Sequence, residues 1–224
     1  MIKIFIGYDK RERTATSLLI DSLNKYSSSP LSITLIKREQ LKGILTRPRG
    51  PLDSTDFSIS RFLTPYLSEY VGWSIFMDCD MLFQDDITKL WNLQDDKHDV
   101  MVVKHQYIPK SERKFDGEKQ TPYTMKNWSS LMMFNNSKCK SLTLDYVNTV
   151  HGLDLHQFKW ASSVGELPKT WNWLADEYEY KEDVSNVHFT LGGPWFHDGI
   201  GSYNKSDYED IWKEYHKECT SYLF

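Results

Sequence analysis

Two carboxylates stand two positions apart at the end of an apolar run, where Asp78 and Asp80 follow the residues 73–77. In extended backbone, side chains at positions i and i+2 share one face, so both carboxylates are expected to point the same way. Ligands of open α/β sheets bind beyond the carboxyl ends of the strands, which is where this pair is expected. A divalent cation is the natural counter-charge for two carboxylates held together. The simpler alternative, in which one acid caps a helix and the other faces water, stays open.

A histidine later in the chain is the third candidate ligand for this metal site. His188 ends a strand-like run, and Gly192 and Gly193 follow it, which let the backbone approach a ligand closely. A set of carboxylates with one imidazole suits Mn²⁺ better than Mg²⁺, which prefers oxygen ligands and is kept as the alternative ion. A single histidine is more often structural, so the role of His188 depends on whether it meets the two aspartates.

Phosphohydrolases of the haloacid dehalogenase type are an alternative class, because they also place an Asp-x-Asp motif after an apolar strand. Their motif lies near the N-terminus and continues with Thr or Val. Here Leu82, the fourth residue after Asp78, stands at the position of that Thr or Val, and about seventy residues with two predicted strands precede the motif. The phosphohydrolase interpretation is therefore disfavoured.

The elements that must position these residues alternate between strands and helices. Strands are predicted at Ile2–Ile6, Leu31–Ile36, Ser74–Met77, Val100–Val103, Ser129–Phe134 and Val187–Thr190. Helices are predicted at Thr14–Tyr26, Phe57–Tyr70, Lys138–Val150, Leu155–Ala161 and Ser206–Cys219. This order predicts an α/β fold with a mostly parallel central sheet flanked by helices. The polar stretch 109–126 is interpreted as a long loop that covers the ligand as a lid.

Length and composition exclude several classes of protein. A chain of 224 residues is expected to form one enlarged domain, 1–224. The net charge of −4 and the absence of a basic run give no sign of a nucleic-acid partner. Without a long apolar run, a secretory signal or a cysteine framework, we expect no membrane span and a cytoplasmic location. The aromatic content of 14% fits either core packing or a cleft for nucleotides and sugars.

Taken together, the motifs resemble the retaining glycosyltransferases of family 8, which have the GT-A fold and use UDP-sugars with manganese. The resemblance is carried by Gly7-Tyr8-Asp9, Ser58 to Phe62, Asp78-Cys79-Asp80, Asn127 to Asn135, Leu167 to Asn172 and His188. It implies a single GT-A domain with a nucleotide-binding half at about 1–105 and a sugar and acceptor half at about 106–224.

The resemblance also implies the roles of individual residues. The metal ligands would be Asp78, Asp80 and His188. The nucleotide would be bound by Gly7, Tyr8, Asp9, Arg11, Arg61, Cys79, Gly192 and Gly193, with Tyr8 stacked on uracil. The sugar would be bound by Lys104, Asn127, Ser129 and Gln157. Gln157 and Asp154 are the catalytic candidates.

The sequence departs from the family pattern near the sugar and the diphosphate. Ser130 replaces a glycine, and Gly193 replaces a lysine whose charge Lys104 or Arg11 is expected to supply. Gln157 is a poor nucleophile, so we expect its amide to stabilise or orient the sugar. Asp154 is a spare carboxylate or, alternatively, a helix N-cap.

The function expected from these residues is metal-dependent transfer of a sugar, a hexose by expectation, from a UDP-sugar with retention of configuration. The acceptor is open among a glycan, a lipid-linked sugar and a protein. The alternative is a catalytically silent module of the same fold that binds a nucleotide or a sugar.

Overall fold

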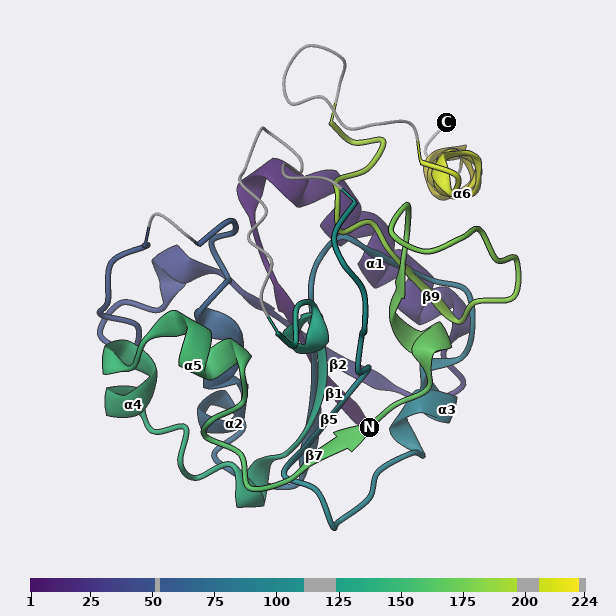
Figure 1. The fold of residues 1–224 in the computed structure, drawn as a ribbon. Helices are drawn as coiled ribbons and strands as arrows, with labels where there is room; N and C mark the ends of the chain where they lie inside the picture. The colour runs from purple at the N-terminus through teal and green to yellow at the C-terminus, as the bar shows by residue number, and fades with distance from the viewer. Residues whose placement is uncertain (51–52, 111–123, 197–205, 222–224) are drawn as a thin grey trace.

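The computed structural model describes residues 1–50, 53–110, 124–196 and 206–221, which form one α/β domain around a six-stranded sheet (Figure 1). The strands lie in the order β2 (Leu31–Ile36), β1 (Ile2–Gly7), β3 (Trp73–Met77), β6 (Leu131–Asn135), β5 (Val100–Val102) and β7 (Val164–Glu166). Strand β1 runs parallel to β2 and β3, and β5 runs parallel to β7. Strand β6 is antiparallel to both of its neighbours. The predicted α/β sheet is confirmed.

A smaller sheet lies beside the central one and consists of β4 (Met81–Phe83), β9 (Asn186–His188) and β8 (Trp173–Leu174). Strand β4 pairs with β9 in antiparallel register, with Met81 opposite His188. Only residues 78–80 separate β3 of the central sheet from β4 of the small sheet. The loop that carries both aspartates therefore lies where the two sheets meet.

The helices cover both sides of the central sheet. They are α1 (Arg13–Tyr26), α2 (Thr64–Leu67), α3 (Ile87–Trp91), α4 (Leu144–Thr149), α5 (Gly152–His156) and α6 (Glu209–Thr220). Short 3₁₀ helices occupy Lys10–Glu12, Arg38–Gln40, Ser60–Leu63, Trp128–Ser130, Asn136–Lys138 and Lys169–Asn172. In Figure 1, α2, α4 and α5 are grouped on one side of the sheet, and α1 and α3 lie on the other. No helix in the described part of the chain has the length and apolar character needed to cross a membrane.

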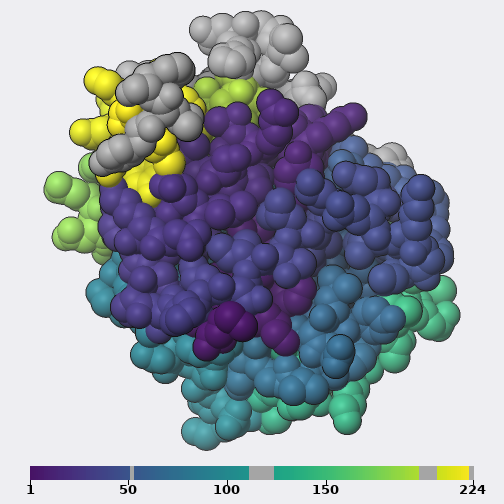
Figure 2. All heavy atoms as spheres, turned by 180° about the vertical axis from the view of Figure 1, so that it is seen from behind, coloured from purple at the N-terminus to yellow at the C-terminus, as the bar shows by residue number. Residues whose placement is uncertain are grey.

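Helix α6 closes the domain by packing along α1, as the rear view in Figure 2 shows. The Tyr215 hydroxyl donates to Asp21 at 2.8 Å, and Lys25 pairs with Glu218 at 2.7 Å. Trp212 of α6 is buried in an apolar cluster that also contains Ala15 and Leu18 of α1. The C-terminal helix is thus joined to the first helix of the chain by both apolar and polar contacts.

Three predicted helices are much shorter than expected. The helix predicted at Lys138–Val150 is α4, which begins only at Leu144, where the Thr143 side chain caps its first turn. For the other two, the backbone gives the reason. The segment 57–70 is divided into a 3₁₀ turn and α2, because Pro65 has no N–H to continue an α-helical ladder. It ends where Glu69 and Tyr70 both adopt left-handed φ angles of 56°. The helix predicted at 155–161 is instead α5, which ends at His156, and Phe158 has a left-handed φ of 56°.

The aromatic residues are mostly core. Trp160, Trp171, Trp195 and Trp212 are all buried, and the Phe134 and Trp160 rings stack with centroids 6.0 Å apart. Trp128 and Trp173 are only partly buried. Core packing therefore accounts for most of the aromatic content, and a minority of rings reach the surface.

Candidate functional site

The loop that carries Asp78 and Asp80 is held from both sides by backbone hydrogen bonds. The N–H of Asp78 donates to the Ser130 carbonyl at 2.8 Å, just before β6 begins. The carbonyl of Asp80 accepts from the Phe189 N–H at 2.9 Å, just after β9 ends. The positions of both carboxylates are therefore tied to strands that come much later in the sequence.

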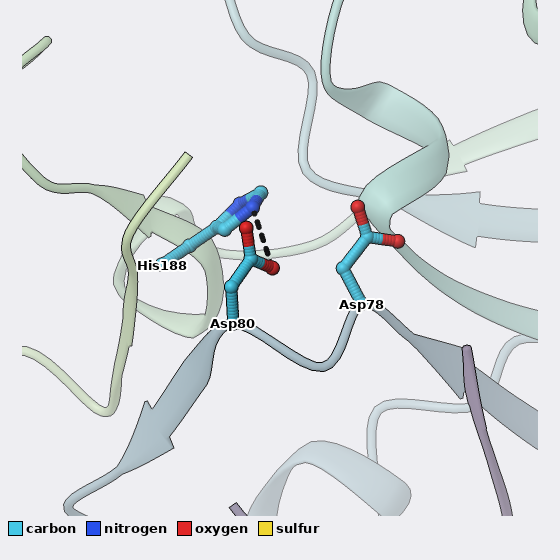
Figure 3. Close-up of side chains that lie close together, drawn as sticks. All are labelled: Asp78, Asp80 and His188. Carbon is cyan, nitrogen blue, oxygen red and sulfur yellow. Dashed lines mark ion pairs between the residues drawn. The ribbon is translucent and has the colours of Figure 1, made fainter. Parts of the chain in front are cut away.

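His188 meets these carboxylates because its strand is paired with the one that follows Asp80. Its Nε2 atom lies 3.3 Å from Asp80 Oδ1, and Figure 3 shows the two side chains pointing toward each other. Asp78, Asp80 and His188 each offer one ligand atom, and these atoms lie within 4.8 Å of one another. The prediction that the three side chains come together is confirmed.

The chemistry of this cluster fits a divalent cation. Asp80 and His188 are buried, and Asp80 Oδ1 has no hydrogen-bond partner among the described residues. Neighbouring ligands in an octahedral site with bonds of about 2.1 Å lie about 3 Å apart, close to the separation of Asp80 Oδ1 and His188 Nε2. Carboxylate and imidazole ligands are both used by divalent metals such as Mn²⁺.

Arg61 forms an ion pair with Asp78, one of the three side chains of the candidate metal site. Its Nη1 atom lies 2.9 Å from Asp78 Oδ1 and donates to the Ser129 carbonyl at 2.9 Å. The guanidinium also lies 5.2 Å from the ring centroids of Phe57 and Phe76. The sequence predicts that Arg61 contacts the nucleotide, and in the structure its partners are Asp78 and the Ser129 carbonyl.

Directly after β1, Asp9 and Arg11 form a hydrogen-bonded ion pair. Asp9 is 1% exposed and accepts hydrogen bonds from the backbone and guanidinium of Arg11, at 2.8 to 3.0 Å. Burial raises the pKa of Asp9, but the hydrogen bonds and charge of Arg11 outweigh it and hold the pKa below its usual value. Arg11 also donates to the Ser54 carbonyl at 2.7 Å. Tyr8 is half-buried, with the Lys37 Nζ atom 4.5 Å from its ring centroid.

Packing explains two of the three glycines that were assigned to the nucleotide, and backbone conformation explains the third. A Cβ at Gly7 would lie 2.4 Å from the Phe57 ring, and one at Gly193 would lie 2.2 Å from the Trp195 ring. Gly192 has a φ of 100°, which side-chain-bearing residues rarely adopt. These positions require glycine whether or not a ligand is bound.

The Cys79 side chain lies between the two aspartates in sequence but points into the protein. It is fully buried, and its thiol donates to the Glu12 carboxylate at 3.4 Å. Burial raises the pKa of Cys79 well above its usual value. The thiol is therefore not accessible to a ligand, and the predicted nucleotide contact of Cys79 would have to come from its backbone.

Of the predicted sugar-binding residues, Asn127 and Ser129 lie just before β6, Lys104 lies just after β5, and Gln157 lies directly after α5. Asn127 has a left-handed φ of 61°. Ser129 Oγ lies 2.8 Å from His156 Nδ1. Lys104 extends over Trp128, with Nζ 5.9 Å from the ring centroid.

The two catalytic candidates lie in and directly after α5. Gln157 is half-buried, and its Nε2 donates to Thr124 Oγ1 at 3.0 Å. Asp154 pairs with Lys159 at 2.5 Å. The N-cap interpretation of Asp154 is wrong, because His151 caps α5 through its Nδ1 atom and Asp154 lies inside the first turn. The predicted lid falls largely on residues 111–123, which lie outside the described part of the chain.

Two residues next to the metal cluster were missed by sequence reasoning. Asn172 Oδ1 lies 2.9 Å from His188 Nδ1, although the motif that contains Asn172 predicts no role for it. His105 is buried with its Nδ1 atom 2.7 Å from the Tyr178 hydroxyl. Burial, with a contribution from the charge of His188, lowers the pKa of His105 to about 3. Only the motif around Asn172 could have signalled either residue.

Comparisons with known proteins give one relative by sequence and several by fold. No protein-family model matches the chain. Protein CDI of Arabidopsis thaliana is 43% identical over 231 residues, which cover 96% of this chain and 88% of that protein. The membership of glycosyltransferase family 8 suggested by the motifs therefore stays a prediction.

Three solved structures illustrate the likeness in fold. The galactosyltransferase LgtC, crystallised with donor and acceptor sugar analogues, gives a TM-score of 0.59 at 11% identity, over 97% of this chain and 96% of that one. The bifunctional glycosyltransferase WbbM gives 0.65 at 13% identity, over 99% of this chain and 51% of that one. GlyE of Streptococcus pneumoniae gives 0.59 at 14% identity, over 96% and 61%. The predicted GT-A fold is confirmed.

Proposed function

The chain belongs to the same family as Protein CDI of Arabidopsis thaliana, and we propose that it is a retaining glycosyltransferase with a UDP-sugar as its donor. The observation that supports this most strongly is the cluster of Asp78, Asp80 and His188. It lies at the carboxyl end of β3, where ligands of α/β sheets bind. A structure of similar fold, LgtC, was crystallised with donor and acceptor sugar analogues. The motifs that resemble family 8 support UDP and retention.

The reaction requires a diphosphate to leave while positive charge develops on the sugar. A divalent cation, Mn²⁺ by its ligand set with Mg²⁺ as the alternative, would supply the Lewis acid that stabilises the departing diphosphate. Asp80 and His188 present their ligand atoms to it from facing strand ends. Arg61 keeps Asp78 oriented and balances its charge.

The residues near the sugar favour orientation over attack. Gln157 carries a neutral amide, which can stabilise the developing charge or hold the sugar but is a weak nucleophile. Asp154 is engaged by Lys159, so it is the less available of the two candidates. With retention, and with neither Gln157 nor Asp154 well suited as a nucleophile, we propose that the acceptor enters on the face from which the diphosphate leaves, and that the departing phosphate takes the acceptor proton.

The nucleotide and acceptor are proposed to lie on either side of the metal cluster. Tyr8 and the Asp9 and Arg11 unit, directly after β1, are the proposed uridine contacts. Asn127 and Lys104 are proposed to face the sugar. The acceptor is a glycan, a lipid-linked sugar or a protein.

The test is the release of UDP from a panel of UDP-hexoses and UDP-pentoses, with and without Mn²⁺. We expect slow hydrolysis of one donor that requires the metal and is abolished by Asp80→Asn. The matched control is Asp85→Asn, because Asp85 pairs with Lys89 on the surface and contacts none of the cluster residues. Absence of release with every donor would favour the silent binding module, and release that survives Asp80→Asn would remove the metal cluster from the mechanism.

A further inference from the structure

A chain of buried hydrogen bonds leads to the side of His188 that faces away from Asp80. His188 Nδ1 lies 2.9 Å from Asn172 Oδ1. The Asn172 amide donates to Ser130 Oγ at 2.8 Å, and Ser130 Oγ in turn donates to the Asn127 carbonyl at 2.7 Å. The side chains of His188, Asn172 and Ser130 belong to residues no more than 1% exposed, so bulk water does not compete for these bonds.

The donor and acceptor roles in this series of hydrogen bonds are fixed by the Asn127 carbonyl, at which the series ends. A backbone carbonyl only accepts, so the Ser130 hydroxyl donates its proton to Asn127 and must accept from the Asn172 NH₂ group. The oxygen end of the Asn172 amide then faces His188. The proton of the neutral imidazole is therefore held on Nδ1, and the lone pair of Nε2 is directed toward Asp80.

The same turn also holds the aspartate loop. The Ser130 carbonyl accepts from the Asp78 N–H at 2.8 Å, while the Ser130 hydroxyl receives Asn172. The Asn127 side chain fixes the turn by donating to the Tyr107 hydroxyl at 2.7 Å and to Thr190 Oγ1 at 3.1 Å. The segment 127–130 thus helps to position both the loop that carries Asp78 and, through Asn172, the His188 side chain.

Building on the proposed function, we propose that Asn172 and Ser130 are positioning residues that fix the tautomer of His188 and so prepare Nε2 to bind the metal. Metal-binding histidines commonly donate their other ring N–H to such a partner, and loss of that partner typically lowers metal affinity about 10–100-fold. Ser130 stands where the family 8 pattern has glycine, which carries no hydroxyl. The direction of the Asn172 amide is therefore set by a hydroxyl that the family 8 pattern lacks.

The tautomer can be measured without metal or substrate. Long-range ¹H–¹⁵N NMR of the metal-free protein, recorded at alkaline pH so that the imidazole is neutral, reports which ring nitrogen carries the proton. We expect the His188 proton on Nδ1 in the wild type and on Nε2 in Asn172→Ala, where Asp80 becomes the available acceptor. Asn172→Asp is the matched control, because it keeps an acceptor for Nδ1–H.

Metal affinity is the second readout, measured from the EPR signal of free Mn²⁺ in the presence of UDP. Asn172→Ala is expected to weaken Mn²⁺ binding about 10–100-fold, and Asn172→Asp to retain most of it. Ser130→Ala is the milder variant if Asn172→Ala does not fold. Its Asn172 amide can turn, so we expect a mixture of tautomers and an intermediate affinity.

The outcomes separate the positioning role from the proposed function. A wild-type His188 that carries its proton on Nε2 would overturn the positioning role, as would an Asn172→Ala protein with unchanged tautomer and affinity. A third outcome separates the two proposals: the His188 proton lies on Nδ1 in the wild type and moves to Nε2 in Asn172→Ala, but the wild type binds no Mn²⁺. This outcome would support the role of Asn172 in fixing the tautomer and count against the metal-dependent transferase.

Discussion

Replacing Arg61 by methionine tests how the chain holds Asp78, the first carboxylate of the candidate metal site. Arg61 is 6% exposed, and its guanidinium lies 2.9 Å from Asp78 Oδ1 and donates to the Ser129 carbonyl at 2.9 Å. Methionine keeps apolar volume beside Phe57 and Phe76 but removes the counter-charge of Asp78. Removing one partner of a buried ion pair costs about 3–5 kcal/mol. Since the Asp78 side chain retains 13% exposure, we expect the lower end, about 3 kcal/mol.

The assay is a double-mutant cycle with Asp78→Asn, measured by thermal and urea unfolding. In a chain of this size, about 3 kcal/mol corresponds to a fall in Tm of about 6–12 °C. Because Arg61→Met leaves a charge without its counter-charge and the double variant has neither charge, the double variant should be more stable than the sum of the single effects predicts. We expect a coupling free energy of about 1–3 kcal/mol.

The cycle has a clear contradicting result. If the two substitutions add within about 0.5 kcal/mol, Arg61 and Asp78 do not stabilise each other, and the arginine is free to act on the donor directly. A matched comparison is Arg61→Lys, which keeps the charge but cannot reach both Asp78 and Ser129 with one planar group. It should lie between the wild type and Arg61→Met.

Three further predictions concern other parts of the chain. Gly7→Ala is expected to destabilise the protein by about 1–3 kcal/mol in thermal unfolding, because the new Cβ would lie 2.4 Å from the Phe57 ring, and an unchanged Tm would contradict this. Burial raises the pKa of Asp86, but hydrogen bonds from Ser28 and Thr88 outweigh it and bring the pKa to about 2. Asp86 therefore stabilises α3 most fully above its unfolded pKa of 3.8. At neutral pH, Asp86→Ala should lower the free energy of unfolding by about 0.5–2 kcal/mol. In acid-unfolding curves, this difference from the wild type should shrink as the pH falls from 3.8 toward 2. Gln157→Ala should lower kcat for donor hydrolysis while leaving Mn²⁺ affinity within about twofold, and an equal loss of both would assign Gln157 to the metal site instead.

The parts of the structure that follow from local sequence were predicted well. The apolar run before Asp78 forms β3, and the run that ends at His188 forms β9. Both signals are local, because strand formation depends on apolar residues in short extended runs. The meeting of Asp78, Asp80 and His188 followed only from combining the Asp78-Cys79-Asp80 motif with the segment of His188, and the pairing of β4 with β9 now explains it.

The partners of the site residues were not predictable in the same way. Arg61 was predicted to contact the nucleotide, and the structure shows a partner that the sequence did not indicate, Asp78, because the groups that a guanidinium meets depend on the packing of the chain. The glycines at positions 7 and 193 were assigned to a ligand, but the rings of Phe57 and Trp195 already exclude a side chain there. Such contacts join residues whose spatial relation no local pattern encodes.

The network behind His188 was missed for a related reason. The motif that ends at Asn172 was noticed, but its role depends on the direction of an amide, which is set by Ser130 about forty residues earlier. Hydrogen-bond direction is a property of the assembled site. Sequence reasoning therefore found the groups that present ligand atoms and missed the groups that orient them.

The stereochemistry of donor hydrolysis tests the central claim most directly. With a UDP-α-hexose that the protein cleaves in the presence of Mn²⁺, ¹H NMR during the first turnovers identifies the anomer of the released sugar before it equilibrates. A retaining glycosyltransferase releases the α-anomer first, and Asp80→Asn should abolish the signal. First release of the β-anomer, or no metal-dependent cleavage of any donor, would contradict the proposed function.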